Sequence, residues 1–159
     1  MKGKLVWNSG MSFSGLTDSG FTVPMDASVD HGGANEGPRP MELILLGLGG
    51  CTAMDTISIL QKKRQEVTDF EVQVHAGRAT EHPKVITDAI IEYMVTGRNL
   101  DEAAIVRAIE LSATRDCPAQ AMFGKLMPIE LKYHLYEDQG NGQRELVKSA
   151  VYTPAAQEA

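Results

Sequence analysis

The centre of the chain reads Gly-Leu-Gly-Gly-Cys-Thr-Ala-Met-Asp over residues 47–55. Apolar residues occur on every side of the segment from Leu43 to Met54. A helix that is apolar all round belongs in the middle of a core. Pro40 suits a first helical turn, and basic residues near Arg64 suit the negative end of a helix dipole. The sequence therefore predicts a buried helix from Pro40 to about Arg64.

Three glycines inside this predicted helix, Gly47, Gly49 and Gly50, require an explanation. Each glycine destabilises a helix interior by roughly 1 kcal/mol relative to alanine, so the missing side chain must allow something that alanine would block. One explanation is close packing against a second helix or a twofold-related copy of the same helix. The other is space for a reactant beside Cys51, and the two explanations are compatible.

Short β-rich segments precede the helix. The sequence predicts a small meander of three strands at Lys4–Trp7, Ser12–Leu16 and Phe21–Met25. Three glycines and two prolines over residues 30–40 then predict a loop, and a long loop beside a helix start can line a functional site.

Alternating strands and amphipathic helices follow the central helix. The predicted elements are a hairpin of Phe70–Ala76 and Val85–Thr96, helices from Leu100 to Thr114 and from Pro118 to Lys125, and a strand at Ile129–Tyr136. This order predicts an α+β domain over residues 1–138. For the polar tail, residues 139–159, we expect a short helix at Glu145–Ala150 or no regular structure.

Composition narrows the classes of function. The 159 residues are 43% apolar, enough for one domain with one core, and 15 basic against 21 acidic residues give a net charge of −6. This charge argues against nucleic acid and against a polybasic membrane surface. The longest apolar run, Leu43 to Met54, is too short to cross a membrane, and the polar N-terminus lacks a signal peptide core, so we expect a cytoplasmic protein.

Two cysteines, Cys51 and Cys117, are the candidates for chemistry. A buried cysteine is often only a small apolar residue. Cys117, however, precedes Pro118 at a predicted helix start, where free backbone N–H groups and nearby Arg115 favour a thiolate and Asp116 opposes it. Two such thiols suit peroxide chemistry if their sulfurs meet in the fold.

Other classes of site have little support. The four histidines show no His-x-x-His spacing and the cysteines no Cys-x-x-Cys spacing, so neither a metal nor a cofactor is predicted. The glycines of residues 47–50 lie inside a helix, without the spacing of a nucleotide-binding loop.

The motifs together resemble the OsmC/Ohr superfamily, in its uncharacterised OsmC-like branch, over about residues 3–136. They are Arg-Pro-Met-Glu-Leu at 39–43, the central segment at 47–55, Glu-His-Pro-Lys-Val at 81–85, and Cys117-Pro118. The resemblance implies a two-layer α+β fold of curved antiparallel sheets packed on two central helices, in an intertwined homodimer. It also implies reduction of organic, and in some members inorganic, hydroperoxides at the expense of a dithiol, with Cys51 as the peroxidatic and Cys117 as the resolving cysteine.

The chain departs from the family pattern at two charged positions. Met41 stands where characterised members carry a glutamate, and Glu42 is one residue further on, which rotates its side chain by about 100° around a helix. Residues 1–38 contain no arginine, although the family arginine comes from that region. We expect Arg115 or Arg39 to replace it. Asp55, one turn after Cys51, would either raise the thiol pKa or make a structural hydrogen bond.

Three hypotheses remain. The first is a hydroperoxide reductase, and its candidate residues are Cys51, Cys117, Arg115, Arg39 and Glu42. An apolar wall would favour alkyl peroxides; it comprises Leu43, Leu46, Met54, Met122 and Phe123. The second is a dimeric module that binds a small apolar ligand in a cleft lined by Met41, Met54, Met94, Met122 and Met127. The third is a redox sensor whose thiols are oxidised stoichiometrically.

Overall fold

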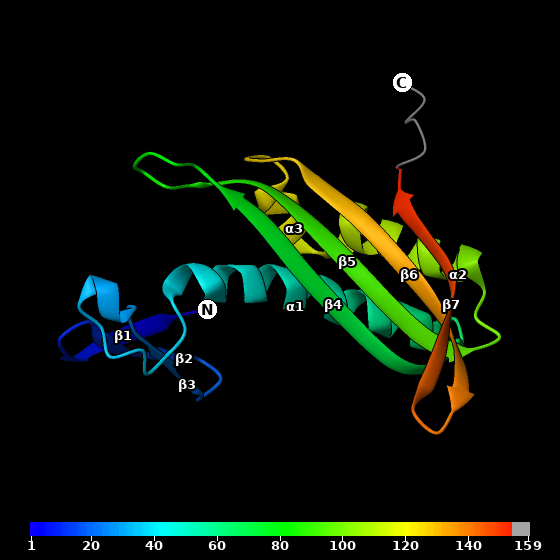
Figure 1. Ribbon diagram of the computed structural model, residues 1–159, viewed down its shortest axis with the longest axis horizontal. Coiled ribbons are helices and arrows are strands. Elements are labelled where there is room, and N and C mark those ends of the chain that lie inside the picture. Colours follow the sequence, from blue (N-terminus) through cyan, green and yellow to red (C-terminus); the bar gives the residue numbers. More distant parts are fainter. Residues whose placement is uncertain (154–159) are drawn as a thin grey trace. The chain divides into compact units, whose positions relative to one another are not determined.

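The computed structural model describes residues 1–153. Its Cα positions group into two compact units, Met1–Leu46 and Gly47–Ala159, and each unit is described by itself (Figure 1). The boundary falls inside the long helix α1, Pro40–Lys62. The α+β class is confirmed, whereas one domain over residues 1–138 stays a prediction.

The N-terminal unit contains a three-stranded antiparallel sheet. Its elements are β1 (Gly3–Ser9), β2 (Ser12–Thr17), β3 (Thr22–Met25) and the 3₁₀ turn η1 (Val29–His31). The order in the sheet is β1-β2-β3, with Trp7 opposite Phe13 and Phe13 opposite Met25. The predicted meander is therefore confirmed.

Asp26 is the only buried residue among residues 1–46. Its carboxylate accepts hydrogen bonds from the backbone N–H of Ala27 (2.8 Å), Ala34 (2.9 Å) and Glu36 (3.1 Å). These bonds, that of Glu36 foremost, hold the pKa of Asp26 below its ordinary value. The loop after β3 is thus organised around one carboxylate.

Helix α1 confirms the position of the predicted central helix, whereas its expected burial on every side is wrong for the single chain, in which Met54 is 71% exposed. Glu42 Oε2 accepts a hydrogen bond of 2.9 Å from the backbone N–H of Arg39, the half of a capping box in which an N3 side chain reaches back. By length and composition, α1 is also apolar enough to cross a membrane, so considering only Leu43–Met54 was too narrow a test. Core helices pass the same test, and α1 gives Leu48 and Leu60 to the core.

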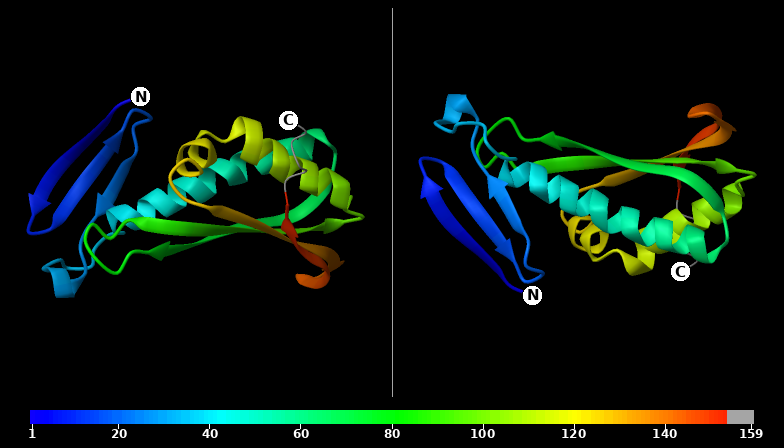
Figure 2. Two further views of the ribbon diagram at one scale, coloured as in Figure 1. Left: turned by 90° about the horizontal axis from the view of Figure 1, so that it is seen from above. Right: turned by 90° about the horizontal axis from the view of Figure 1, so that it is seen from below.

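The C-terminal unit is a four-stranded sheet with helices on one face (Figure 2). Its elements are β4 (Glu66–Arg78), β5 (Ile86–Arg98), α2 (Glu102–Leu111), the π-helical turn η2 (Ser112–Asp116), α3 (Pro118–Phe123), β6 (Ile129–Gly140) and β7 (Gln143–Tyr152). The order in the sheet is β4-β5-β6-β7. Strands β5 and β6 run parallel, because the α2–α3 segment returns the chain to the end where β5 began, and the other pairs are antiparallel.

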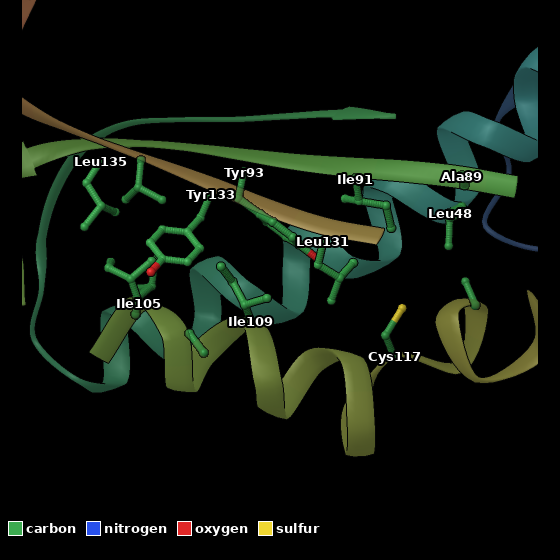
Figure 3. Close-up of a cluster of buried hydrophobic side chains, with 14 of the residues drawn as sticks. Leu48, Ala89, Ile91, Tyr93, Ile105, Ile109, Cys117, Leu131, Tyr133 and Leu135 are labelled. Carbon is green, nitrogen blue, oxygen red and sulfur yellow. The ribbon is translucent and has the colours of Figure 1, made fainter. Parts of the chain in front are cut away.

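The core lies between α1, α2 and the covered face of this sheet (Figure 3). Tyr93, Ile105 and Ile109 have no exposed surface, and Leu48 is 1% exposed. Cys117 belongs to the same cluster at 2% exposed. The second cysteine is therefore part of the core itself.

The prediction for the polar tail is wrong in the described residues. Instead of a helix at Glu145–Ala150, strand β7 pairs with β6, with Tyr133 opposite Ala150. The turn Gly140-Asn141-Gly142 has positive φ at all three residues, which glycine and asparagine tolerate, and it joins the two strands as a hairpin. Residues 154–159 lie outside the described part.

The three helical glycines have different surroundings. A Cβ on Gly49 would lie 2.9 Å from Val74 Cγ2, so this glycine allows close packing of α1 on β4. A Cβ on Gly47 or Gly50 would meet nothing within 4 Å. Packing within the chain therefore explains only Gly49.

Candidate functional site

Helix α1 places Cys51 beside the core. Its side chain packs against the buried cluster and is only partly exposed. Thr52, the next residue, is fully buried. The thiol of Cys51 therefore lies between the core and the surface of the helix, where a small reactant can reach it.

A π-helical turn places Cys117. The backbone N–H of Cys117 donates to the carbonyl of Ser112 at 2.9 Å, a hydrogen bond across five residues rather than four. Such turns are rare and occur often at functional sites. Cys117 then caps α3, because its sulfur accepts a hydrogen bond of 3.4 Å from the backbone N–H of Gln120. The turn and the cap together fix the direction of the thiol.

The fold brings the two sulfurs together. The Sγ atoms of Cys51 and Cys117 and a carboxylate oxygen of Asp55 all lie within 4.8 Å of one another. Both cysteines are free, and both belong to the C-terminal unit. The condition that the sequence could not test, the meeting of two thiols that are remote along the chain, is met by this geometry.

Burial dominates the electrostatics of Cys117. The pKa of Cys117 is raised to about 11, chiefly by removal from water and also by the neighbouring Cys51, although the N–H groups of Gln120 and Ala119 act to lower it. The sequence expectation that a helix start favours the thiolate of Cys117 is therefore wrong in its net sign. The cap contributes as expected, but burial outweighs it.

A buried polar network lies behind the thiols. Thr52 Oγ1 is 2.6 Å from the hydroxyl of Tyr93 and 2.9 Å from Ser112 Oγ. The side-chain amide of Gln120 donates to Thr52 Oγ1 at 2.7 Å and to the Tyr93 hydroxyl at 3.3 Å. Gln120 thus holds Cys117 through its backbone and α1 through its side chain. The sequence analysis missed this network, although polar residues inside apolar helical segments were its visible signal.

Asp55 has an unusual environment. Its Oδ2 atom is buried and has no hydrogen-bond partner among the described residues. Burial, and next the negative charge of Asp116, raise the pKa of Asp55. The structural hydrogen bond considered for Asp55 is therefore not made by this oxygen within the described chain.

The three predicted charged residues have hydrogen-bond partners within their own units. Arg115 is 66% exposed, and its guanidinium is bound to the carboxylate of Asp116 at 2.8 and 3.1 Å. Arg39 lies in the N-terminal unit, where it donates to Asn35 Oδ1 and to the carbonyl of Gly37. The carboxylate of Glu42 caps the start of α1. In the described residues, each of these three side chains has a structural partner.

The methionines of the cleft predicted for a dimer differ in their exposure. Met94 and Met127 are buried in it, whereas Met54 is 71% and Met122 61% exposed. A hollow of about 300 Å³ beside α3 and β6 includes Met127 and Gln120 in its lining, without the other three methionines. Because the cleft was expected in a dimer, the ligand-binding hypothesis stays a prediction.

Known proteins are similar to this chain in sequence and in fold. The model of the family described as OsmC-like protein matches residues 32–132. The protein YhfA of Escherichia coli K12 is 38% identical over 135 residues, which cover 85% of this chain and 98% of YhfA.

Two solved structures have a similar fold at lower sequence identity. A hypothetical protein from Aquifex aeolicus is 28% identical, with a TM-score of 0.76 over 87% of this chain and 97% of its own. An organic hydroperoxide resistance protein OsmC from Legionella pneumophila is 16% identical, with a TM-score of 0.58 over 82% and 95%. The second likeness is one of fold alone.

Proposed function

The chain belongs to the OsmC-like protein family, and from this premise we propose that it reduces hydroperoxides with its two thiols. Cys51 is the attacking residue and Cys117 the resolving residue. One observation carries the proposal: two free thiols from separate elements lie within 4.8 Å of each other at the edge of a core. The relatives named for organic hydroperoxide resistance support the same chemistry.

The reaction has two chemical steps and one reductive step. The thiolate of Cys51 attacks the terminal oxygen of a hydroperoxide, the O–O bond breaks, and the alkoxide leaves and takes up a proton. The thiol of Cys117 then displaces water from the Cys51 sulfenic acid and forms a disulfide. An external dithiol reduces this disulfide to two thiols and becomes a disulfide itself. A few ångströms of approach separate the present sulfurs from the bond length of about 2 Å.

The exposure of the two cysteines supports these roles. Cys51 is partly exposed, whereas Cys117 is 2% exposed, so a peroxide reaches Cys51 first. The backbone N–H of Gln120 holds the sulfur of Cys117 in place, which suits a thiol that reacts only after the Cys51 sulfenic acid has formed. A partly exposed attacking thiol and a resolving thiol that is held in place support this division of roles.

A cation is still needed to stabilise the thiolate and the leaving oxygen. Arg115 is the local candidate and Arg39 the alternative. For Arg115 to serve, it must exchange its bond to Asp116 for the Cys51 thiolate, which its 66% exposure permits. Glu42 contributes through the start of α1 and has no direct role in this proposal.

The substrates follow from the surface around Cys51. Met54 and Met122 are largely exposed apolar side chains on α1 and α3. Alkyl hydroperoxides would be favoured over hydrogen peroxide by such surroundings. A dithiol reductant and a reducing, cytoplasmic setting complete the proposal, because the thiols must return to the free state after each turnover.

A homodimer is part of the proposal. On α1, Ile44 is 39%, Leu46 67% and Met54 71% exposed. The open space above Gly47 and Gly50 allows another backbone to approach this helix closely. A second copy of the chain, as in the family, would cover this surface.

The test is a thiol titration after exposure to one equivalent of cumene hydroperoxide. Wild-type protein should lose two thiols and form one intramolecular disulfide. The two serine variants form a matched pair: Cys51→Ser should consume no hydroperoxide, and Cys117→Ser should stop at a sulfenic acid on Cys51 that dimedone traps.

Two outcomes would overturn the proposal. An unchanged thiol count in folded wild-type protein would remove the enzyme and leave the ligand-binding hypothesis. Oxidation that is stoichiometric, with no turnover in the presence of any dithiol, would select the redox sensor instead.

A further inference from the structure

Three potential metal ligands meet at one end of the core. The ligand atoms of Cys51, Asp55 and Cys117 all lie within 4.8 Å of one another. Sequence spacing gave no sign of this cluster, because the motifs searched for were Cys-x-x-Cys and His-x-x-His. The fold supplies what the spacing lacks, since Cys117 arrives from the π-helical turn η2 rather than from the same segment.

We propose that Cys51, Asp55 and Cys117 form a binding site for a thiophilic divalent cation, with zinc as the probe. Cys51 and Asp55 are four residues apart on α1, so their side chains lie on one face of the helix and can chelate one ion. Cys117 approaches the same point from the other side of the site. Thiolate sulfur and carboxylate oxygen are both ligands that zinc binds in proteins.

The dimensions fit the ion. A tetrahedral zinc ion with bonds of about 2.3 Å to sulfur and 2.0–2.2 Å to oxygen separates its ligand atoms by roughly 3.5–3.8 Å. The observed upper limit of 4.8 Å means that the ligand atoms need to approach one another by at most about 1.3 Å. Partial exposure of Cys51 provides the path by which the ion enters.

A second observation points to an occupant. Oδ2 of Asp55 is buried and has no hydrogen-bond partner among the described residues. A buried carboxylate oxygen without a donor is costly, and a coordinated cation would satisfy it. The backbone N–H of Gln120 orients the Cys117 sulfur, and so supplies the outer contact that metal ligands commonly have.

Zinc binding changes the protonation and the net charge of the site. One Zn²⁺ displaces the two thiol protons and leaves a site with a net charge of −1 and a fourth position open to solvent. The effect of zinc on peroxide reduction rests on the proposed function. A hydroperoxide that takes two electrons from the bound thiolates, with two protons, would yield the disulfide, an alcohol and water, and would release the ion. Bound zinc and peroxide reduction therefore exclude each other at this site.

The test is competition for zinc between the reduced, tag-free protein and a chromophoric chelator. Wild-type protein should take up one equivalent, and both cysteine-to-serine variants should take up none. Asp55→Asn should weaken binding about tenfold or more, an effect typical of lost metal-site contacts. Asp69→Asn is the matched control, because Asp69 is an exposed residue of β4 that is paired with Arg144 and is not part of the cluster, and this variant should bind zinc as tightly as wild type.

X-ray absorption of the wild-type zinc complex needs no variant, and so remains informative if a variant fails to fold. The expected shell is two sulfurs at about 2.3 Å with oxygen at about 2.0–2.2 Å. Uptake of less than one equivalent, uptake that survives Cys51→Ser, or equal affinity in Asp55→Asn would each overturn the site.

The outcome is separable from that of the proposed function. Zinc uptake together with thiols that ignore hydroperoxide would leave the metal site standing and remove the enzyme. Peroxide reduction by a protein that takes up no zinc would do the reverse.

Discussion

The two units of the chain differ in what they bury. The C-terminal unit surrounds an apolar cluster that includes Tyr93, Ile105 and Ile109, and both cysteines contact that cluster. The N-terminal unit buries one residue, Asp26, and leaves Trp7 63% exposed. A three-stranded sheet needs a packed apolar face to be stable. The comparison teaches that the chemistry is built on the self-sufficient unit, and that the other unit needs a surface to pack on.

The largest difference should appear in the core. Ile109→Ala should lower the free energy of unfolding by about 2–5 kcal/mol, because Ile109 has no exposed surface and its truncation leaves a cavity. Leu5→Ala in the N-terminal sheet, where Leu5 is 64% exposed, should change the unfolding of the dissociated subunit by about 0.5 kcal/mol or less.

Urea denaturation at low protein concentration measures both changes. If a second copy covers the N-terminal sheet, Leu5→Ala should raise the dissociation constant of the dimer in analytical ultracentrifugation. Equal losses in both variants of the dissociated subunit would erase the contrast between the units.

Two glycines on helix α1 allow a packed position and an open position to be compared within one element. Gly49→Ala should destabilise the protein by about 1 kcal/mol net. The new Cβ would clash with Val74, and the free energy lost to this clash exceeds the free energy gained from the higher helix propensity of alanine. Gly50→Ala meets open space, so it should stabilise an isolated subunit by up to about 1 kcal/mol.

Thermal unfolding over a range of protein concentrations separates the two effects. A Gly50→Ala variant that is stabilised as a dimer as well would contradict the close approach of a second copy.

The smallest effect is expected at Asp26 and depends on pH. Its folded pKa is lowered, so its carboxylate stabilises the loop at pH values above the ordinary pKa of 3.8, and this contribution is lost as the pH falls through the lower folded pKa. Backbone amide shifts of Ala34 and Glu36 in an NMR titration should report that lowered midpoint. Asp26→Asn should remove the titration, and a midpoint at or above 3.8 in wild-type protein would show that the hydrogen bonds do not hold the charge.

Most elements could be predicted from local pattern. The run around Leu48 and the alternation in Phe70–Ala76 gave α1 and β4 because helical and extended periodicities differ. Strand β7 was missed because the Gly-Asn-Gly turn was interpreted as the start of a tail, although Asn-Gly is a local signal for a hairpin and β7 pairs with the strand directly before it.

The site was predictable in part. The identity of the two cysteines followed from their type and from the resemblance to a family. The sign of the pKa shift at Cys117 did not, because burial is a property of the whole fold and it outweighs the local helix start. The Asp55 cluster and the Thr52 network likewise required tertiary contacts.

The length of the five-residue turn before Cys117 determines the direction of the Cys117 thiol. Deleting one residue from Ser112–Asp116 would restore regular helical hydrogen bonding, yet it would swing everything downstream by about 100° and draw it back by roughly 1.5 Å. The sulfur would then face away from Cys51. The irregular turn therefore sets the alignment of the two thiols to within a single peptide unit.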